Sequence, residues 1–368
     1  MKKQLLRTML LLFALVAGGQ SVWGAGIYEK VTSAPTDWSG VYLIVYEGDE
    51  NHDACAFDGA LESLDQAKKG VAVTISAGVI TGSSAIDAAT FTIAKSGDNY
   101  TIKSASGYYI GQTSYANGLK STTVDKDAYA NSIALDNGKA VITSNLGGGD
   151  GKQVTLRYNY ASDQLRFRYY KSGQQAIALY KLTGYEATIT SAGYATFAAP
   201  YAVDFSATSL EVYTAQVNGA KNGVVLNEVA SKQVPANTAV ILKGATAAGA
   251  VIATADALEN NDLVAGPVTG DGVSYYALGK EGEKVGFGIL ADGTELPANK
   301  AYIAASKFGA SAPAFMPFSF GETTGISEKV IVNSEKFASA PVYNLNGQRV
   351  MNPTKGLYIV NGRKVAIK

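Results

Sequence analysis

Short runs of alternating apolar and polar residues recur along the chain after its first two dozen positions. Residues 40–46 read Gly-Val-Tyr-Leu-Ile-Val-Tyr, and similar runs follow at 91–93, 100–103 and 140–142. Clusters of Gly, Asn, Asp and Ser separate such runs at intervals of about 8–12 residues, which is the pattern of an all-β sandwich or barrel. We therefore predict an all-β protein with a helix content well below that of an average globular protein.

The N-terminal residues have a different pattern, typical of a secretory signal. Lys2, Lys3 and Arg7 accompany an apolar run at 9–17, and small residues follow it. The run is shorter than the ~20 residues that span a bilayer, and its flanks match an export signal. We predict that residues 1–24 are removed and that the protein is exported to the extracellular space or the outer cell surface. A retained membrane anchor is the alternative, and no later segment is apolar for long enough to span a membrane.

Turn-forming residues divide the remainder into three predicted modules. The first module spans residues 27–183 and the second spans residues 185–320. The second contains Pro-Ala-Asn at 235–237 and again at 297–299, each time before an apolar run, which predicts two equivalent strand entries in one β-sandwich. The third module, residues 326–368, contains two Asn-Gly dipeptides that favour tight hairpins.

Charge and composition narrow the function classes. Without residues 1–24 the chain has 28 Lys and Arg against 31 Asp and Glu, a formal charge of −3, so global attraction to nucleic acid or an anionic membrane is not expected. Cys55 is the only cysteine and His52 the only histidine. An intrachain disulfide is impossible, and serine triads, Cys–His dyads and zinc sites with several His or Cys ligands are almost excluded. We predict no cofactor and no metal site.

The most suggestive local feature is a predicted hairpin at 154–171. Alternation gives it an apolar face formed by Val154, Leu156, Tyr158, Tyr160, Leu165, Phe167 and Tyr169. The opposite face carries Arg157, Arg166, Arg168 and Tyr170. Guanidinium groups bind carboxylate and phosphate, and a tyrosine ring can stack on a sugar or a base. The alternative is an ordinary charged outer face that nearby carboxylates balance.

A second candidate group combines aromatic rings with polar neighbours. It consists of Trp38, Tyr108, Tyr109 and Tyr115, with Gln112 and Asn117. A sugar platform needs such flat rings beside hydrogen-bonding groups, whereas core packing is the alternative. We count Tyr108, Tyr109 and Gln112 with the arginine-bearing hairpin as predicted ligand-binding residues. The acidic loop at 47–53 lacks the ligand order of an EF-hand, so a solvated turn is favoured over a calcium site.

Several stretches resemble known protein families. The run at 91–111, Phe-Thr-Ile to Tyr-Tyr-Ile-Gly, is similar to the strand–turn–strand unit of β-trefoil lectins and fascin-like proteins. This resemblance implies a β-trefoil for the first module, with another small β-barrel or sandwich as the alternative. The stretches at 107–119, 156–172 and 192–205 resemble β-modules that accompany secreted nucleases and polysaccharide-degrading enzymes of Bacteroidetes, and they bring no assigned functional residues.

The C-terminal residues resemble the C-terminal sorting domains of secreted Bacteroidetes proteins. The shared features are Tyr-x-Leu-x-Gly-x-x-Val, Gly-Leu-Tyr-Ile-Val and a basic Lys-Val-x-x-Lys ending. They place the motif on Tyr343, Leu345, Gly347, Val350, Gly356, Tyr358, Lys364 and Lys368. The resemblance implies recognition by an export and surface-attachment machinery. A terminal pair of purely structural hairpins is the alternative.

These observations favour an exported, non-catalytic binding or adhesion protein that recognises glycans or another anionic extracellular polymer. Nucleic acid is a less favoured partner because the chain is near neutral. One alternative is a structural subunit of the cell surface or matrix, which would offer an exposed edge strand to a neighbour. Another is a glycoside hydrolase, because its carboxylate pair leaves no sequence signature.

Overall fold

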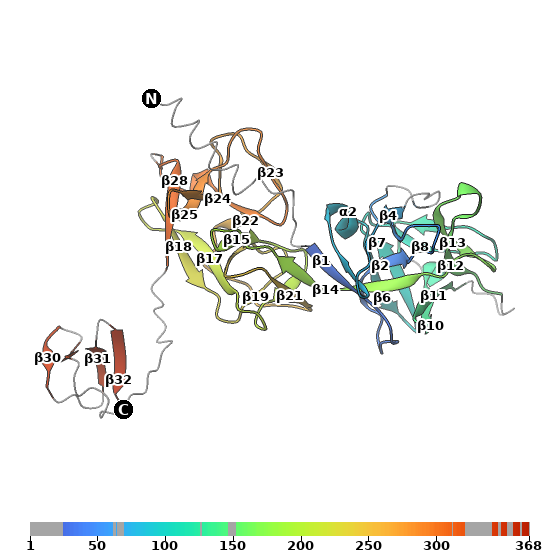
Figure 1. Cartoon of the computed structure of the whole chain (residues 1–368), viewed down its shortest axis with the longest axis horizontal. Coiled ribbons are helices and arrows are strands. Elements are labelled where there is room, and N and C mark those ends of the chain that lie inside the picture. Colours follow the sequence, from blue (N-terminus) through green and yellow to red (C-terminus); the bar gives the residue numbers. More distant parts are fainter. Residues whose placement is uncertain are drawn as a thin grey trace. The chain divides into compact units, whose positions relative to one another are not determined.

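The computed structural model describes residues 25–61, 64, 70–125, 127–145, 152–310, 312–320, 341–344, 347–351, 356–360 and 363–367. Strands account for 50% of the structure and helices for 4%, which confirms the predicted all-β class (Figure 1). The chain divides into two compact units between Ser319 and Phe320. Within the described residues, no helix has the length and apolar character needed to cross a membrane.

Six strands in the first unit close into a ring that approaches a barrel. In ring order they are β2 (Gly40–Tyr46), β6 (Phe91–Ser96), β7 (Asn99–Ser104), β10 (Asn131–Asp136), β11 (Lys139–Ser144) and β14 (Ala178–Ala187). A bridge between Ala140 and Ile177 joins β11 to the residue before β14. All the pairings are antiparallel, which suits the short turns that the sequence places between successive strands.

Three pairs of shorter strands connect successive ring strands. They are β3 (Cys55–Phe57) with β4 (Gly70–Ala72), β8 (Tyr109–Gly111) with β9 (Lys120–Thr122), and β12 (Thr155–Asn159) with β13 (Arg166–Tyr170). The first strand of each pair is bonded to the ring strand before it. The remaining short elements are β5 (Val79–Thr81), α2 (Ser84–Ala88), η1 (Asp127–Tyr129) and η2 (Ala161–Asp163).

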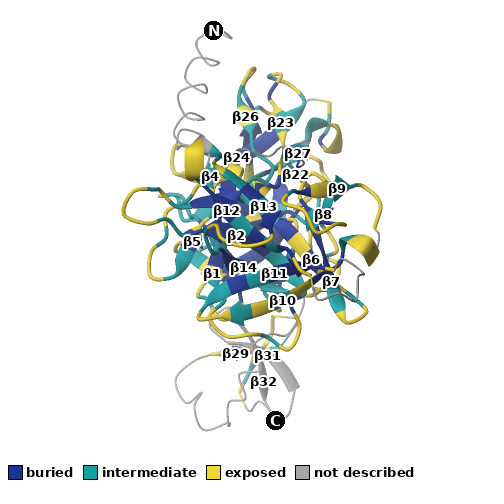
Figure 2. Cartoon of the chain, turned by 90° about the vertical axis from the view of Figure 1, so that its right-hand side faces the viewer, coloured by how far each residue is buried: buried dark blue, intermediate teal, exposed yellow. Residues whose placement is uncertain are grey.

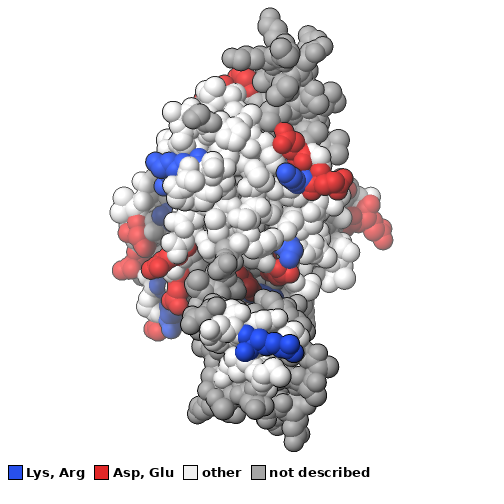
Figure 3. Space-filling view, turned by 90° about the vertical axis from the view of Figure 1, so that its left-hand side faces the viewer, with Lys and Arg blue, Asp and Glu red and all other residues white. Residues whose placement is uncertain are grey.

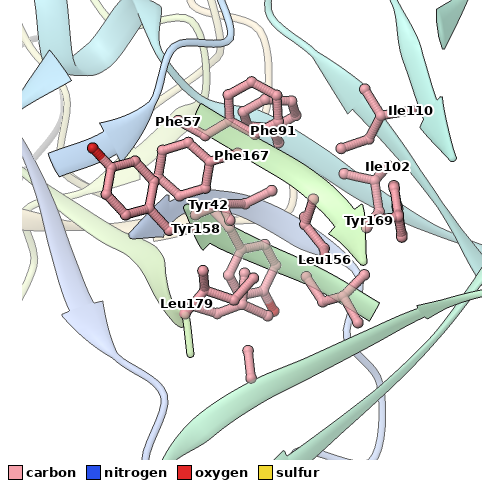
Figure 4. Close-up of a cluster of buried hydrophobic side chains, with 14 of the residues drawn as sticks. Tyr42, Phe57, Phe91, Ile102, Ile110, Leu156, Tyr158, Phe167, Tyr169 and Leu179 are labelled. Atoms are coloured by element: carbon pink, nitrogen blue, oxygen red, sulfur yellow. The ribbon is translucent and has the colours of Figure 1, made fainter. Parts of the chain in front are cut away.

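Large apolar side chains from the ring and the outer pairs fill the interior (Figure 4). Phe57 and Phe167 stack with their ring centres 5.0 Å apart, and Tyr42 is completely buried. Each buried side chain of this size stabilises the fold by about 1.5–3 kcal/mol. Leu43 and Val45 point away from this interior and are nevertheless also buried, in a second core. Burial on both faces explains why β2 is apolar almost throughout.

Strand β14 connects the ring to the rest of the first unit. One of its edges pairs with β1 (Ala25–Lys30). Along the other edge, its first residues pair with β2 and its last residues pair with β21 (Ala247–Ile252). The strand continues to Ala187 and so runs through the position of the predicted module boundary. The division at residues 183–185 stays a prediction.

The strands that follow β14 form two successive sets. The first contains β15 (Tyr194–Phe197), β16 (Ala202–Asp204), β17 (Glu211–Val217), β18 (Val224–Glu228), β19 (Gln233–Val234) and β20 (Val240–Lys243). The second contains β22 (Leu263–Ala265), β23 (Val268–Thr269), β24 (Tyr275–Glu281), β25 (Lys284–Ile289), β26 (Glu295–Leu296) and β27 (Ala301–Ala304), followed by η3 (Ala305–Lys307) and β28 (Phe315–Phe320).

Pairing within the two sets is the same. In each set the first strand pairs with the sixth, the second with the fifth, and the third with both the fourth and the sixth. The two Pro-Ala-Asn segments lead into β20 and β27, so they are equivalent strand entries as predicted. Both segments form a backbone hydrogen bond with the residues that follow β15. The Asn237 N–H donates to the Ala199 carbonyl, and the Asn299 carbonyl accepts from the Ala198 N–H. A third core lies between the two sets.

The second unit contains a four-stranded antiparallel sheet. Its strands are β29 (Val342–Tyr343), β30 (Arg349–Val350), β31 (Gly356–Val360) and β32 (Arg363–Ile367), in the order β30-β29-β31-β32. Gly347 has a φ of 80°, the left-handed conformation that a tight turn requires. Of the predicted sorting residues, Leu345 and Lys368 lie outside the described residues. The sorting role of the others stays a prediction.

Candidate ligand-binding site

The β12–β13 hairpin presents the predicted arginines on one face. Arg157 lies opposite Arg168, and Asn159 lies opposite Arg166. Side chains alternate between the faces of a strand, so these residues share the outer face. The alternating residues Leu156, Tyr158, Phe167 and Tyr169 point into the ring and are buried (Figure 4). Leu165 departs from the predicted apolar face, because it precedes β13 with a φ of 40° and is 45% exposed.

The side chains of Arg157, Arg166 and Arg168 are all half-buried. The Nε atom of Arg166 is buried and has no hydrogen-bond partner within the described ranges. Burial and the neighbouring charge of Arg166 together lower the pKa of Arg168 below its usual value. Arg157 and Arg166 form no ion pair with any residue that the structure describes. Described carboxylates therefore do not balance these two charges.

Tyr170 lies at the end of the same row and differs from its predicted role. Its side chain is only 5% exposed, so its ring offers no open face for stacking. Its hydroxyl is buried and has no hydrogen-bond partner among the residues that the structure describes. Most buried hydroxyls in proteins are paired, so within the described part of the chain this hydroxyl is an exception.

The members of the predicted aromatic group differ in burial and in the residues that they contact. Trp38 is 5% exposed and belongs to the ring core. Tyr108 packs partly against this core, and Tyr109 lies beneath Lys103, whose Nζ is 5.1 Å from the ring centre. Tyr115 is 43% exposed. These residues do not form a single flat platform.

Gln112 holds its own loop closed. It is 2% exposed, its side-chain nitrogen donates to the Ala116 carbonyl at 3.0 Å, and its side-chain oxygen accepts from the Thr113 N–H at 3.0 Å. Both polar atoms therefore have partners within residues 112–118. In this structure Gln112 positions the loop and does not extend toward solvent.

The loop at 112–118 lies beside β13, a contact that sequence reasoning missed. Gly118 and Tyr169 exchange backbone hydrogen bonds of 2.9 and 2.8 Å. The Asn117 side chain accepts from the Lys171 N–H, and the Lys171 ammonium lies 4.9 Å from the centre of the Tyr115 ring. The contact brings Tyr115 and Lys171 together at the end of β13. Its residues are separated by about fifty positions, so no local pattern indicates it.

A second missed contact lies at the turn of the hairpin. The His52 ring stacks on the Tyr160 ring with centres 3.6 Å apart, and His52 Nδ1 is 2.9 Å from Asp49 Oδ1. Hydrogen bonds from the Asn51 backbone, His52 and Tyr46 lower the pKa of Asp49. The loop at 47–53 is therefore attached to the hairpin. Within the described ranges, no group of three or more His, Cys, Asp or Glu side chains is arranged to hold a metal ion.

On the face shown in Figure 3, uncharged residues dominate the centre, and Lys, Arg, Asp and Glu side chains lie toward the sides and the lower part. Exposed residues lie mainly in the connecting loops, and buried residues concentrate in the strands (Figure 2).

Comparison with known proteins gives no match to a family model, to a curated protein or to a solved structure. Function is therefore inferred from the site.

Proposed function

We propose that the protein is an exported, non-catalytic binding protein that holds glycans or another anionic polymer at the outer cell surface. The observation that carries this proposal is the row of Arg157, Arg166 and Arg168 on one outer strand face. The formal net charge of the whole chain is zero. A local concentration of guanidinium groups on a neutral protein favours binding of an anion at that place over general attraction to polyanions.

The strand order of the first unit supports a β-trefoil for the predicted first module, residues 27–183. Along the chain, a ring strand, an outer pair and a second ring strand occur three times in succession. The groups are β2-β3-β4-β6, β7-β8-β9-β10 and β11-β12-β13-β14. This threefold order agrees with the resemblance of residues 91–111 to β-trefoil lectins. It also makes the arginine-bearing hairpin the outer pair of the third group.

Export and surface attachment are supported by the two ends of the sequence. The N-terminal residues have the order of a secretory signal. The sorting-like motif includes Tyr343 and Val350, which lie in the small C-terminal sheet. The first part of this proposal is tested by N-terminal sequencing of the protein recovered from the producing cells. A mature chain that begins near residue 25 is expected, and an intact N-terminus contradicts export by cleavage.

Binding is tested with residues 25–368 on an array of glycans and nucleic acids. We expect binding to anionic glycans, and we expect it to be lost in the Arg166→Ala/Arg168→Ala variant. The control is Lys280→Ala/Lys284→Ala, which removes two charges from β24 and β25 and leaves the hairpin unchanged. Failure to bind any polymer contradicts the proposed function. Binding that the arginine variant retains places the site elsewhere.

A further inference from the structure

The distribution of arginine within the chain is uneven. The sequence contains six arginines and twenty-five lysines. Arg7 lies in the predicted signal, and Arg349 and Arg363 lie in the second unit. The other three arginines all lie on the outer face of the β12–β13 hairpin. Every other basic residue between positions 25 and 319, apart from His52, is a lysine.

Arginine and lysine differ in how they bind oxyanions. A guanidinium is a planar fork that forms two parallel hydrogen bonds with a carboxylate or with two oxygens of a sulfate, whereas an ammonium is a compact point charge. Lysine supplies positive charge throughout the rest of this unit. The choice of arginine at all three hairpin positions therefore indicates a requirement for the fork and not for charge alone.

We infer that the outer face of the β12–β13 hairpin binds the carboxylate or sulfate groups of an acidic polysaccharide through these guanidinium forks. This inference rests on the proposed function and specifies its ligand. Arg157 and Arg166 have no ion-pair partner among the described residues. The Nε atom of Arg166 is buried, so its two terminal nitrogens form the edge that meets the ligand.

The spacing of the three arginines suits anions that repeat along a polymer. The Cβ atoms of residues directly opposite on antiparallel strands, such as Arg157 and Arg168, lie about 5 Å apart. Arg166 is two residues from Arg168 on the same strand, a step of about 7 Å. A single small anion is held by one fork or shared between two opposed ones. A chain with an acidic group on successive sugars engages two or three of them.

The same face is poorly suited to nucleic acid. Single-stranded nucleic acid binds to protein by stacking its bases on exposed aromatic rings as well as by contacts to phosphate. The aromatic side chain in the arginine row is Tyr170, and it is 5% exposed. Its hydroxyl is buried as well, so Tyr170 presents neither a ring face nor a donor to a ligand. Guanidinium donors without an exposed aromatic ring in the same row favour an acidic polysaccharide over nucleic acid.

The test compares two substitutions of the same three positions in residues 25–368. Arg157→Lys/Arg166→Lys/Arg168→Lys keeps the charge and removes the forks, and the corresponding triple alanine variant removes both. The probes are polygalacturonate, dextran sulfate, unmodified dextran and oligo(dT). Binding is measured by titration calorimetry at two salt concentrations, and circular dichroism confirms that each variant is folded.

We expect the protein to bind polygalacturonate or dextran sulfate and not dextran. The probe that binds more tightly shows whether the site prefers carboxylate or sulfate groups. The triple lysine variant is expected to bind at least about tenfold more weakly, because each lost bidentate contact is worth a large part of that factor. Unchanged affinity in the lysine variant overturns the inference, since charge then suffices. Arginine-dependent binding of oligo(dT), or binding of dextran that is independent of the arginines, also overturns it. Failure to bind any probe instead contradicts the proposed function itself.

Discussion

At the scale of the residue, Glu47 joins segments that are far apart in the chain. Its carboxylate accepts hydrogen bonds from Lys30, Lys139 and Tyr180, the last at 2.7 Å. Burial alone would raise the pKa of Glu47, but the bonds from Lys139, Lys30 and Tyr180 outweigh it and lower the pKa to about 2. The carboxylate thus attaches β1 and β11 to the start of β14.

We expect Glu47→Gln to lower the free energy of unfolding by about 2 kcal/mol at pH 7, because two lysines lose a partly buried counter-charge. Urea unfolding followed by tyrosine and tryptophan fluorescence measures this change. The matched control is Glu283→Gln, whose carboxylate is fully exposed and 3.9 Å from Lys280; no measurable change is expected there. Equal effects of the two substitutions would show that the Glu47 contacts contribute nothing.

The same carboxylate gives a dependence on pH. Its pKa is lower in the folded chain than the usual 4.5, so its stabilisation is complete above about pH 4.5 and is lost as the pH falls toward 2. We expect the stability difference between the native protein and Glu47→Gln to shrink over this interval. Unfolding curves at pH 7, 5, 4 and 3 measure it. A difference that stays constant with pH would contradict the ionic origin of the effect.

At the scale of the element, β14 depends on a close approach to β21. Gly184 lies opposite Ala250, and a Cβ atom at Gly184 would come within 2.6 Å of the Gly249 carbonyl oxygen. We expect Gly184→Ala to destabilise the protein by about 1–3 kcal/mol, because one of the two backbones must move. The control Gly219→Ala has nothing within 4 Å of the new methyl group. If both variants unfold at the same urea concentration, the strands do not pack this closely.

Elements with strong local signals were predictable from the sequence. The strands at 40–46, 91–93 and 100–103 appear with small shifts of boundary, because their alternation and the turns between them are encoded locally. The two faces of the hairpin at 154–171 followed from the same alternation. Tyr170 shows the limit of this reasoning, since its burial is decided by neighbours that no periodic pattern reveals.

Contacts between distant segments were not predictable. The stacking of His52 on Tyr160 joins loops about one hundred residues apart, and the extension of β14 to Ala187 depends on partners on both of its edges. The repeated Pro-Ala-Asn segment was the one long-range signal in the sequence. It indicated equivalent strand entries, whereas the matching pairing of the two whole strand sets became clear from the register.

At the scale of the whole molecule, the first unit depends on a core to which both the ring and the strands after β14 contribute side chains. Tyr28, Leu43 and Tyr180 are at most 1% exposed and pack in one cluster with Phe197 and Val203. The outside of the ring is therefore apolar where the later strands cover it. An isolated ring would expose this surface to water.

We expect a fragment of residues 25–183 to aggregate or to bind the dye ANS strongly, because it leaves the shared core uncovered. A fragment of residues 25–320 retains both halves and is expected to show one cooperative thermal transition without dye binding. Size-exclusion chromatography and ANS fluorescence compare the two. A soluble, dye-free fragment of residues 25–183 would show that the ring does not need the later strands.

The position of β14 also determines how the protein transmits tension. If the hairpin holds an immobile polymer and the C-terminus is fixed to a cell, drag pulls these two points apart. The load leaves the ring along β14, which is bonded to β1 on one edge and to β2 and β21 on the other. A pull along the strand loads these hydrogen bonds together in shear and does not peel them one by one. On the proposed attachment, the junction between ring and later strands would resist a steady force along β14.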